Sequence, residues 1–284
     1  MPEEILTLQK LLTALNHIAP FTMAEPWDNV GLMVGDPDQP VNNILVALDP
    51  TAEVIAEAAS QKINTIITHH PLIFTPLKKI QGNTPQGRML TAAIRHDIAI
   101  IACHTNLDLI NQGVSNALAE QLGLVNSETL SGPKEQPENA PQTGYGKIGR
   151  LPAPLAPEQF LAKVFSALGA TNLKIAGPLP QQIHTVALCG GSGSDLAETA
   201  FARQAQVYIT GEVKHSVARW GEANGFCIID AGHYATEKHI VPVLTTMIRE
   251  TLQRLGHQQT VQATTRQNNP FQCVILHDNK PLYC

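Results

Sequence analysis

The chain has 284 residues, of which 43% are hydrophobic and 15% are charged, and its net charge at pH 7 is −5. A chain of this length can bury a sizeable core in one large or two ordinary domains, and its composition excludes a largely disordered protein. The acidic balance and the lack of a Lys/Arg cluster give no electrostatic footprint for nucleic acid. We therefore expect no nucleic-acid partner.

Membrane insertion and secretion are not expected either. No apolar run reaches the roughly 18 residues of a membrane span, and the acidic start MPEEILTLQKLL does not resemble a secretory signal. The cysteines are scattered and odd in number, which favours free structural thiols over disulfides. These features predict a cytoplasmic protein with no membrane partner.

In the first half of the chain, short apolar strands alternate with helices. A helix is expected at residues 3–16, strands are expected at 43–48, 65–68 and 98–103, and further helices at 52–60, 86–96 and 115–122. Thr51 fits the N-cap of its helix and Gly123 the end of the last one. Continuous Val/Ile/Leu runs separated by helices predict a parallel sheet that is covered on both faces.

The segment 131–143, SGPKEQPENAPQT, interrupts this alternation and is the best candidate for a linker or exposed loop. Beyond it, strands are expected at 145–150, 173–176, 185–188, 207–210 and 226–229, helices at 157–168, 195–204 and 236–255, and two short strands at the end. The segments ILVALDP, NTIITHH and IAIIACH have counterparts, in the same order, in HTVALCG, QVYITGE and FCIIDAGH. This echo indicates an internal duplication, although short apolar matches also arise by chance.

We therefore predict an α/β fold with two similar α/β domains, each a mostly parallel sheet flanked by helices. The first domain would comprise residues 1–128 plus 236–284 and the second residues 129–235. In such sheets, ligands bind outside the carboxyl ends of the strands. The fold thus predicts a site at the C-terminal ends of the strands, between the two domains.

Polar residues with metal-ligand chemistry follow these strands. In the first half, the strand ends carry Asp49, the pair His69-His70, and the segment from His104 to Asp108. In the second half, they carry the turn GGSGSD, then Glu212, then the segment from Asp230 to His233. The GGSGSD turn fits a tight strand-to-helix connection, and phosphate binding stays open as an alternative because helix N-termini bind anions.

Two of these segments contain an imidazole and a carboxylate four residues apart, which are His104 with Asp108 and His233 with Glu237. Residues at this spacing lie on one face of a helical turn. Together with His69 and His70 they form a mixed nitrogen and oxygen donor set, which suits Zn, Fe, Mn, Co or Ni better than Ca or Mg. The remaining histidines, such as His96, stand outside the pattern and are expected to be ordinary surface or core residues.

Neighbouring strand residues point to opposite faces, so one ion can hardly bind both His69 and His70. Two ions about 3.5–4 Å apart can take one imidazole each, and a carboxylate can bridge them. Pro71 helps by preventing continuation of the strand ladder. We therefore predict a cofactor of two divalent transition-metal ions.

These motifs together resemble one family, the dinuclear-metal proteins known as GTP cyclohydrolase 1 type 2 homologues or NIF-three-like proteins. The resemblance covers most of the chain and rests on six ordered motifs: AEPWDNVGLMVGD, ITHHPLIF, HTNLD, the GGSG turn, YITGEVKH and DAGHYATE. It implies that five residues bind the two ions, with Asp108 or Glu237 able to bridge: His69, His70, Asp108, His233 and Glu237.

The resemblance also implies a histidine of the same site at His104, which we expect to face the substrate as a catalytic proton carrier or to support the ligands. Bacterial members of the family form toroidal homo-hexamers with the metal sites facing the interior. Longer members carry an extra domain between the halves, where this chain has only the proline-rich segment. The cyclohydrolase label is inherited and does not identify the substrate.

Two functions remain open at this point. The first is a metal-dependent hydrolase of an unknown small molecule, with nucleotide-like compounds among the candidates, in which the metals activate water. The alternative is a non-catalytic metal-binding scaffold or regulatory protein, which would bind metal without turnover.

Overall fold

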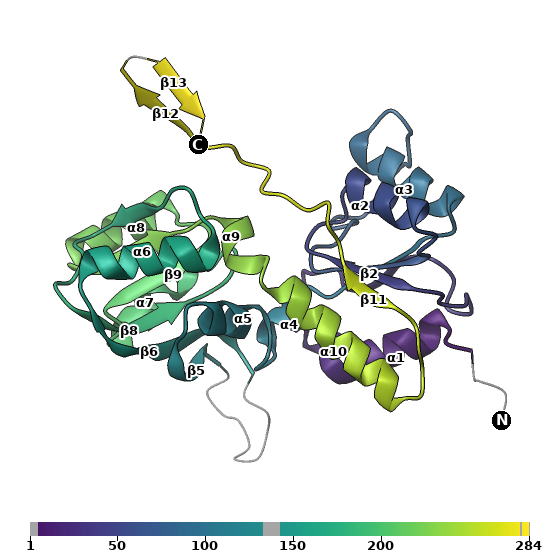
Figure 1. Cartoon of the computed structure of the whole chain (residues 1–284), viewed down its shortest axis with the longest axis horizontal. Helices are drawn as coiled ribbons and strands as arrows, with labels where there is room; N and C mark the ends of the chain where they lie inside the picture. The colour runs from purple at the N-terminus through teal and green to yellow at the C-terminus, as the bar shows by residue number, and fades with distance from the viewer. Residues whose placement is uncertain (1–4, 133–142, 279, 284) are drawn as a thin grey trace. The chain divides into compact units, whose positions relative to one another are not determined.

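The computed structural model describes residues 5–132, 143–278 and 280–283. The chain divides into two compact units, Met1–Leu109 with Ile240–Gln267, and Ile110–His239 with Asn268–Cys284. Each unit contains its own sheet and its own helices (Figure 1).

The sheet of the first unit has the strand order β1-β4-β3-β2-β11. Strands β2, β3, β4 and β11 run parallel, and β1 pairs antiparallel with β4 at the edge. Helices α2 and α3 cover one face, while α1 and α10 cover the other (Figure 1). The bounds are β1 Gly31–Val34, β2 Ile44–Ala47, β3 Thr65–Thr68, β4 Ala99–Ala102, β11 Val261–Ala263, α1 Leu8–Ile18, η1 Phe21–Met23, α2 Ala52–Ser60, α3 Pro85–Arg95, α4 Thr105–Leu109 and α10 Ile240–Arg254.

Local sequence explains the positions of these elements. All residues of β2, β3 and β4 are buried, as expected for apolar strands covered on both faces. The three helices α1, α2 and α3 begin after threonines, Thr7, Thr51 and Thr84, whose side chains accept a hydrogen bond from a backbone N–H of the first turn. These caps fix where each helix begins.

The sheet of the second unit has the strand order β5-β6-β8-β9-β10-β7, in which β8, β9 and β10 run parallel. Strands β5, β6 and β7 pair antiparallel with their neighbours. The bounds are α5 Val114–Gln121, β5 Val125–Ser131, β6 Tyr145–Leu155, α6 Pro157–Leu168, β7 Lys174–Ala176, β8 Ile183–Leu188, η2 Ser194–Leu196, α7 Ala197–Ala202, β9 Val207–Thr210, α8 His215–Ala223, β10 Cys227–Asp230, α9 His233–Glu237, and the hairpin of β12 Val274–His277 and β13 Lys280–Tyr283.

Two cores lie on the two faces of this second sheet. Val207 and Ile209 belong to the core that contains Phe160 of α6, whereas Tyr208 between them belongs to the core against which Trp220 of α8 packs. This division follows from strand geometry, in which successive side chains point to opposite faces. The α/β class expected from the sequence is therefore confirmed, with two helix-covered sheets.

The repeated order of the sequence motifs has a structural counterpart. In both units, three parallel strands lie in chain order (β2-β3-β4 and β8-β9-β10), and an antiparallel strand flanks the third one (β1 and β7). The first sheet is mostly parallel, as expected. The second is parallel only at its centre, because the β5–β6 pair and β7 add antiparallel edges that apolar periodicity does not distinguish.

The observed unit boundaries differ from the expected division into residues 1–128 plus 236–284 and residues 129–235. Helix α5 belongs to the second unit, because Leu118 and Leu122 pack in the core around Phe160. The helix expected over 236–255 is divided into α9 and α10 by a turn at Lys238 and His239, where the chain passes from one unit to the other. Most of the expected linker, 131–143, lies outside the described residues.

Within the described ranges, none of the helices combines the length and the apolar content needed to cross a membrane.

Candidate metal centre

Four of the expected site residues lie in the first unit, at the carboxyl ends of two neighbouring parallel strands. His69 and His70 directly follow β3, His104 follows β4, and Asp108 lies on the short helix α4. The centroid of the His69 ring lies 4.9 Å from that of the His70 ring and 5.1 Å from that of the His104 ring. The ring centroids of His70 and His104 are 5.6 Å apart. One nitrogen from each ring lies within 4.8 Å of the others, so the three imidazoles could hold a single metal ion. This differs from the expectation that one ion can hardly bind both His69 and His70, because both residues lie beyond the end of β3, where the alternation of strand side chains no longer applies.

Each of these three imidazoles is oriented through its Nδ1 atom. His69 Nδ1 lies 2.9 Å from the Cys103 carbonyl oxygen, His70 Nδ1 lies 2.7 Å from Asp49 Oδ1, and His104 Nδ1 lies 2.8 Å from Asp28 Oδ1. Carbonyl and carboxylate oxygens only accept hydrogen bonds, so in each case Nδ1 carries the proton and donates it. The lone pair of each neutral ring is then on Nε2, which is the arrangement that oxygen partners impose on metal-binding histidines.

Asp28 holds His104 from a fully buried position. Its second oxygen accepts hydrogen bonds from the backbone N–H and the hydroxyl of Thr105, at 3.0 and 2.6 Å. Burial raises the pKa of Asp28, but the hydrogen bonds from His104 and Thr105 outweigh it and hold that pKa below its usual value. Burial and the neighbouring His69 lower the pKa of His104, so its imidazole is neutral at pH 7.

Asp49 is itself held in place by the end of the same unit. The Gln267 amide nitrogen donates to Asp49 Oδ2 at 3.2 Å, and the Gln267 side-chain oxygen accepts from the backbone N–H of Leu48 at 2.6 Å. This chain of contacts, from Gln267 to Asp49 to His70, ties the imidazole to the segment that follows β11.

Asp108 occupies a different place from the one that its spacing to His104 suggests. Its backbone N–H donates to the His104 carbonyl at 3.1 Å, which forms the expected helical turn. However, its Oδ1 atom lies 3.7 Å from His69 Nε2, whereas His104 bonds to Asp28. The turn therefore places the carboxylate beside the buried His69 rather than beside the histidine four residues earlier.

The other two expected ligands, His233 and Glu237, lie in the second unit on α9. His233 Nδ1 is 2.9 Å from Glu212 Oε1, and His233 Nε2 is 2.9 Å from Glu237 Oε2. Burial raises the pKa of Glu212, but hydrogen bonds from His233 and Ser192 hold it below its usual value. If Nδ1 donates to Glu212, then Nε2 and the Glu237 carboxylate are two acceptors in contact, and only a shared proton or a cation satisfies both.

The GGSG turn after β8 packs closely on α9. A Cβ atom on Gly191, whose φ is +62°, would lie 2.0 Å from Glu237 Oε1, and one on Gly211 would lie 2.7 Å from His233 Cα. The backbone N–H of Gly191 donates to Thr236 Oγ1 at 3.1 Å. These contacts support the expected tight turn and add a reason for its glycines, which is that the backbone lies where a side chain would displace Glu237.

A cavity of about 700 Å³ in the second unit is lined by His233 and by its partner Glu212. Its lining also includes Lys174, Tyr234 and Lys238. The Lys238 ammonium lies 5.7 Å from the centre of the Tyr234 ring, and burial lowers the pKa of Lys238. The volume lies in the range of small-molecule sites, which is about 300–1,000 Å³.

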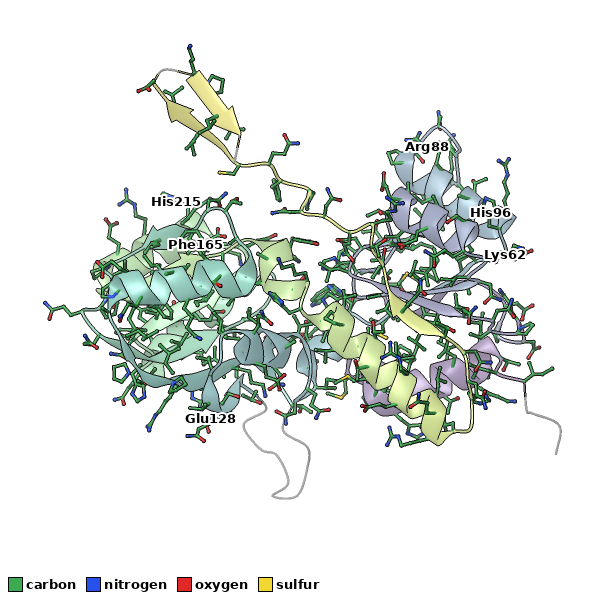
Figure 2. The ribbon with its side chains drawn as sticks, viewed as in Figure 1. Lys62, Arg88, His96, Glu128, Phe165 and His215 are labelled. Atoms are coloured by element: carbon green, nitrogen blue, oxygen red, sulfur yellow. The ribbon has the colours of Figure 1, made fainter. Side chains whose placement is uncertain are left out.

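Residues outside this pattern have ordinary surroundings. His96 at the end of α3 and His215 at the start of α8 are exposed on the outer surfaces of their units (Figure 2). Among the described cysteines, Cys103, Cys189 and Cys227 are buried free thiols. Burial raises the pKa of Cys103 and that of Cys227 to about 12, so neither thiol is a nucleophile at pH 7.

The sequence did not assign a role to the three carboxylates that orient the histidines, Asp28, Asp49 and Glu212. Two of them had a local signal, because Asp49 directly follows the apolar run of β2 and Glu212 follows β9 closely. Asp28 belongs to the motif AEPWDNVGLMVGD but follows no predicted strand, since it lies in a loop and meets His104 only through tertiary folding, 76 residues along the chain.

Comparison with known proteins finds relatives of this chain in sequence and in fold. The family model described as Duf34/NIF3 (NGG1p interacting factor 3) matches residues 6–270. A curated relative from Clostridium acetobutylicum, named GTP cyclohydrolase 1 type 2 homolog, is 32% identical over 267 residues, which cover 94% of this chain and 98% of the relative. A relative of the same name from Streptomyces coelicolor is 35% identical over 233 residues, or 81% of each chain.

Solved structures show the same likeness. The hypothetical protein SA1388 of Staphylococcus aureus has a TM-score of 0.89 and 32% identity, with 95% of this chain and 100% of that chain covered. A Bacillus cereus protein related to NIF3 has a TM-score of 0.88 and 26% identity, with 94% and 99% covered.

Proposed function

The chain belongs to the Duf34/NIF3 family, and we propose that it binds two divalent transition-metal ions and uses them to hydrolyse a small molecule. The proposed ligands are His69, His70 and Asp108 from the first unit and His233 and Glu237 from the second. Zn, Fe, Mn, Co and Ni all suit this nitrogen and oxygen donor set. From the family resemblance we also propose that the chain forms a toroidal homo-hexamer in which the metal sites face the interior.

One observation carries the metal proposal. Four imidazoles, those of His69, His70, His104 and His233, each have Nδ1 within 2.9 Å of a carbonyl or carboxylate oxygen. For His69, His70 and His104 this contact selects the tautomer that has its lone pair on Nε2, and for His233 it does so when Nδ1 is the donor to Glu212. Ordinary surface or core histidines do not require four such contacts between Nδ1 and an oxygen, whereas metal-binding histidines usually make this contact.

The hydrolytic part of the proposal rests on the chemistry of the same residues. Two bound divalent ions supply Lewis acidity and lower the pKa of water. His104 is suited to carry the proton, because Asp28 fixes its Nδ1–H and its lowered pKa leaves Nε2 unprotonated at pH 7. The cavity beside His233 supports a small-molecule substrate, with nucleotide-like compounds among the candidates.

The test is metal analysis and turnover on the same preparation. We expect mass spectrometry of the protein purified without added metal, and then loaded with Zn, Mn or Fe, to give two ions per chain. A panel of nucleotides, cyclic amidines and phosphoesters is expected to contain a compound that is hydrolysed only by the loaded protein. Two tightly bound ions with no turnover, together with stoichiometric capture of a protein partner, would favour the regulatory or scaffold role instead.

The orienting contact between Asp49 and His70 gives a separate prediction. Asp49→Ala removes the acceptor that fixes the His70 tautomer, and metal affinity is expected to fall about 10–100-fold, the usual effect of losing such a partner. Asp49→Asn keeps a carbonyl oxygen and is expected to recover part of the loss. Titration with Zn in competition with a chromophoric chelator measures the affinity.

Asp38→Ala serves as the control for that experiment, because Asp38 is exposed in a loop of the same unit. Equal affinities for the Asp49→Ala and Asp38→Ala proteins would show that Asp49 has no part in metal binding.

A further inference from the structure

Two large aromatic side chains of the first unit are exposed beside the histidine cluster. Trp27 is 60% exposed and Phe74 is 48% exposed, although both residue types usually bury most of their surface. They come from different loops, one before β1 and one after His69-His70. Their rings pack edge to face, with centroids 6.0 Å apart and an interplanar angle of 63°.

The loops that carry these rings are fastened to each other and to the site. Beside Trp27, Asp28 points inward and bonds to His104 and Thr105. The next residue, Asn29, donates from its amide nitrogen to the carbonyl oxygen of Ile73, which directly precedes Phe74, at 2.5 Å. The two loops that carry the exposed rings are therefore fastened to each other, and one of them is fastened by the contact that orients His104.

The aromatic pair directly adjoins His104, the histidine proposed above to carry the proton. The centroids of Trp27 and Phe74 each lie 6.3 Å from the centroid of His104, at interplanar angles of 79°. His104 is also a member of the imidazole cluster, with His69 at 5.1 Å and His70 at 5.6 Å. An exposed apolar surface thus borders a polar, metal-ligating one, and His104 lies where they meet.

We infer that Trp27 and Phe74 form a stacking surface for a planar heteroaromatic ring of the substrate, an inference that rests on the proposed function and names its substrate class. Aromatic faces bind flat π systems through stacking, and this preference tolerates changes of base because every base has a π face. An aliphatic ligand would cover the rings but offer nothing to His104. A flat ring that carries nitrogen and oxygen, as in a nucleobase, satisfies both the apolar and the polar surface.

The test compares ligands that share a sugar phosphate and differ in the ring. Guanosine, adenosine and cytidine 5′-monophosphates are titrated calorimetrically into the full-length, metal-loaded protein, with ribose 5-phosphate as the ringless probe. We expect at least one nucleotide to bind about 10-fold more tightly than ribose 5-phosphate. Trp27→Ala is expected to abolish this preference, Trp27→Phe to retain most of it, and Phe165→Ala, which removes another exposed ring on α6, to leave it unchanged.

Two further measurements keep the outcome clear. In a Trp220→Phe protein, where Trp27 is the remaining tryptophan, the nucleotide is expected to quench the emission and ribose 5-phosphate is not. Equal binding of nucleotides and ribose 5-phosphate, or an unchanged preference in Trp27→Ala, would overturn the inference. So would a Trp27→Ala protein that changes its oligomeric state in sedimentation while it binds nucleotides normally, because the rings would then form a contact between subunits.

The result is separable from that of the hydrolase proposal. A nucleotide preference that depends on Trp27, in a protein without metal-dependent turnover, would support the stacking surface and refute the hydrolase. Metal-dependent turnover without any preference for nucleotides over ribose 5-phosphate would support the hydrolase and refute the stacking surface.

Discussion

His69→Ala and Glu237→Gln are each expected to lower the affinity for divalent metal by at least about 100-fold, because loss of an orienting partner alone costs about 10–100-fold. The two changes probe one proposed ligand in each unit. His69 is 1% exposed and Glu237 is 4% exposed, so bulk water does not easily replace either donor. We expect the bound metal, measured by mass spectrometry after dialysis, to fall from two ions per chain to one or fewer.

Both variants should also lose metal-dependent hydrolysis if the proposed function is correct. Glu237→Gln keeps the shape of the side chain and removes its charge, so it separates the loss of a ligand from a change in packing. His17→Ala and Glu198→Gln are matched controls, since both residues are exposed and distant in sequence from the proposed ligands. Circular dichroism melting of the metal-free proteins checks that each variant folds.

Full turnover in both the His69→Ala and the Glu237→Gln protein would reject the assignment of the site. Loss of turnover with two ions still bound would assign these residues to the reaction but not to the metal.

Gly191→Ala is expected to lower metal affinity at least about 10-fold, the scale of a disturbed support for a ligand. The added Cβ would lie 2.0 Å from Glu237 Oε1 and 3.4 Å from His233 Cε1. The atom in its way is the end of a side chain that can swing aside, so the carboxylate moves more readily than the fold breaks. Gly191 also has a φ of +62°, which costs a residue with a Cβ about 1–2 kcal/mol.

Gly225→Ala is the matched control for this experiment. Gly225 lies in the same unit with a φ of +65°, but a Cβ there would meet nothing within 4 Å. Both substitutions should therefore lower the free energy of unfolding of the metal-free protein by about 1–2 kcal/mol. Only Gly191→Ala should weaken metal binding, as measured by chelator competition.

If the Gly191→Ala and Gly225→Ala proteins bound metal with equal affinity, then displacement of Glu237 by the added Cβ would have no effect on metal binding. The turn would then contribute to folding alone.

Short-range features of the fold could be read from the sequence. The continuous apolar runs of β2, β3 and β4 are buried throughout, as their composition required, and their helices begin at threonine caps. By contrast, the antiparallel pairing of β5, β6 and β7 could not be predicted from the sequence, because the direction of a strand relative to its neighbour depends on the partner strand and not on the strand itself. The break between α9 and α10 could not be predicted either, because it falls where the chain passes from one unit to the other.

The proposed donor residues were visible in the sequence, because each follows a strand or shares a helical turn. The four-residue spacing of His233 and Glu237 brings their Nε2 and Oε2 atoms to 2.9 Å on α9. The same spacing between His104 and Asp108 was less informative, since Asp108 faces His69, which comes from another strand.

The sequence by itself determined the residue types of the proposed donors, the strands that end at them and the alternation of helix and strand, because these depend on neighbours within a few residues. Only the tertiary structure decided which oxygen holds which imidazole. Asp28 meets His104 across 76 residues, and Glu212 meets His233 across 21. A hydrogen bond fixes a tautomer only when two atoms come within about 3 Å, and that distance depends on how the strands pack and not on the order of residues along the chain.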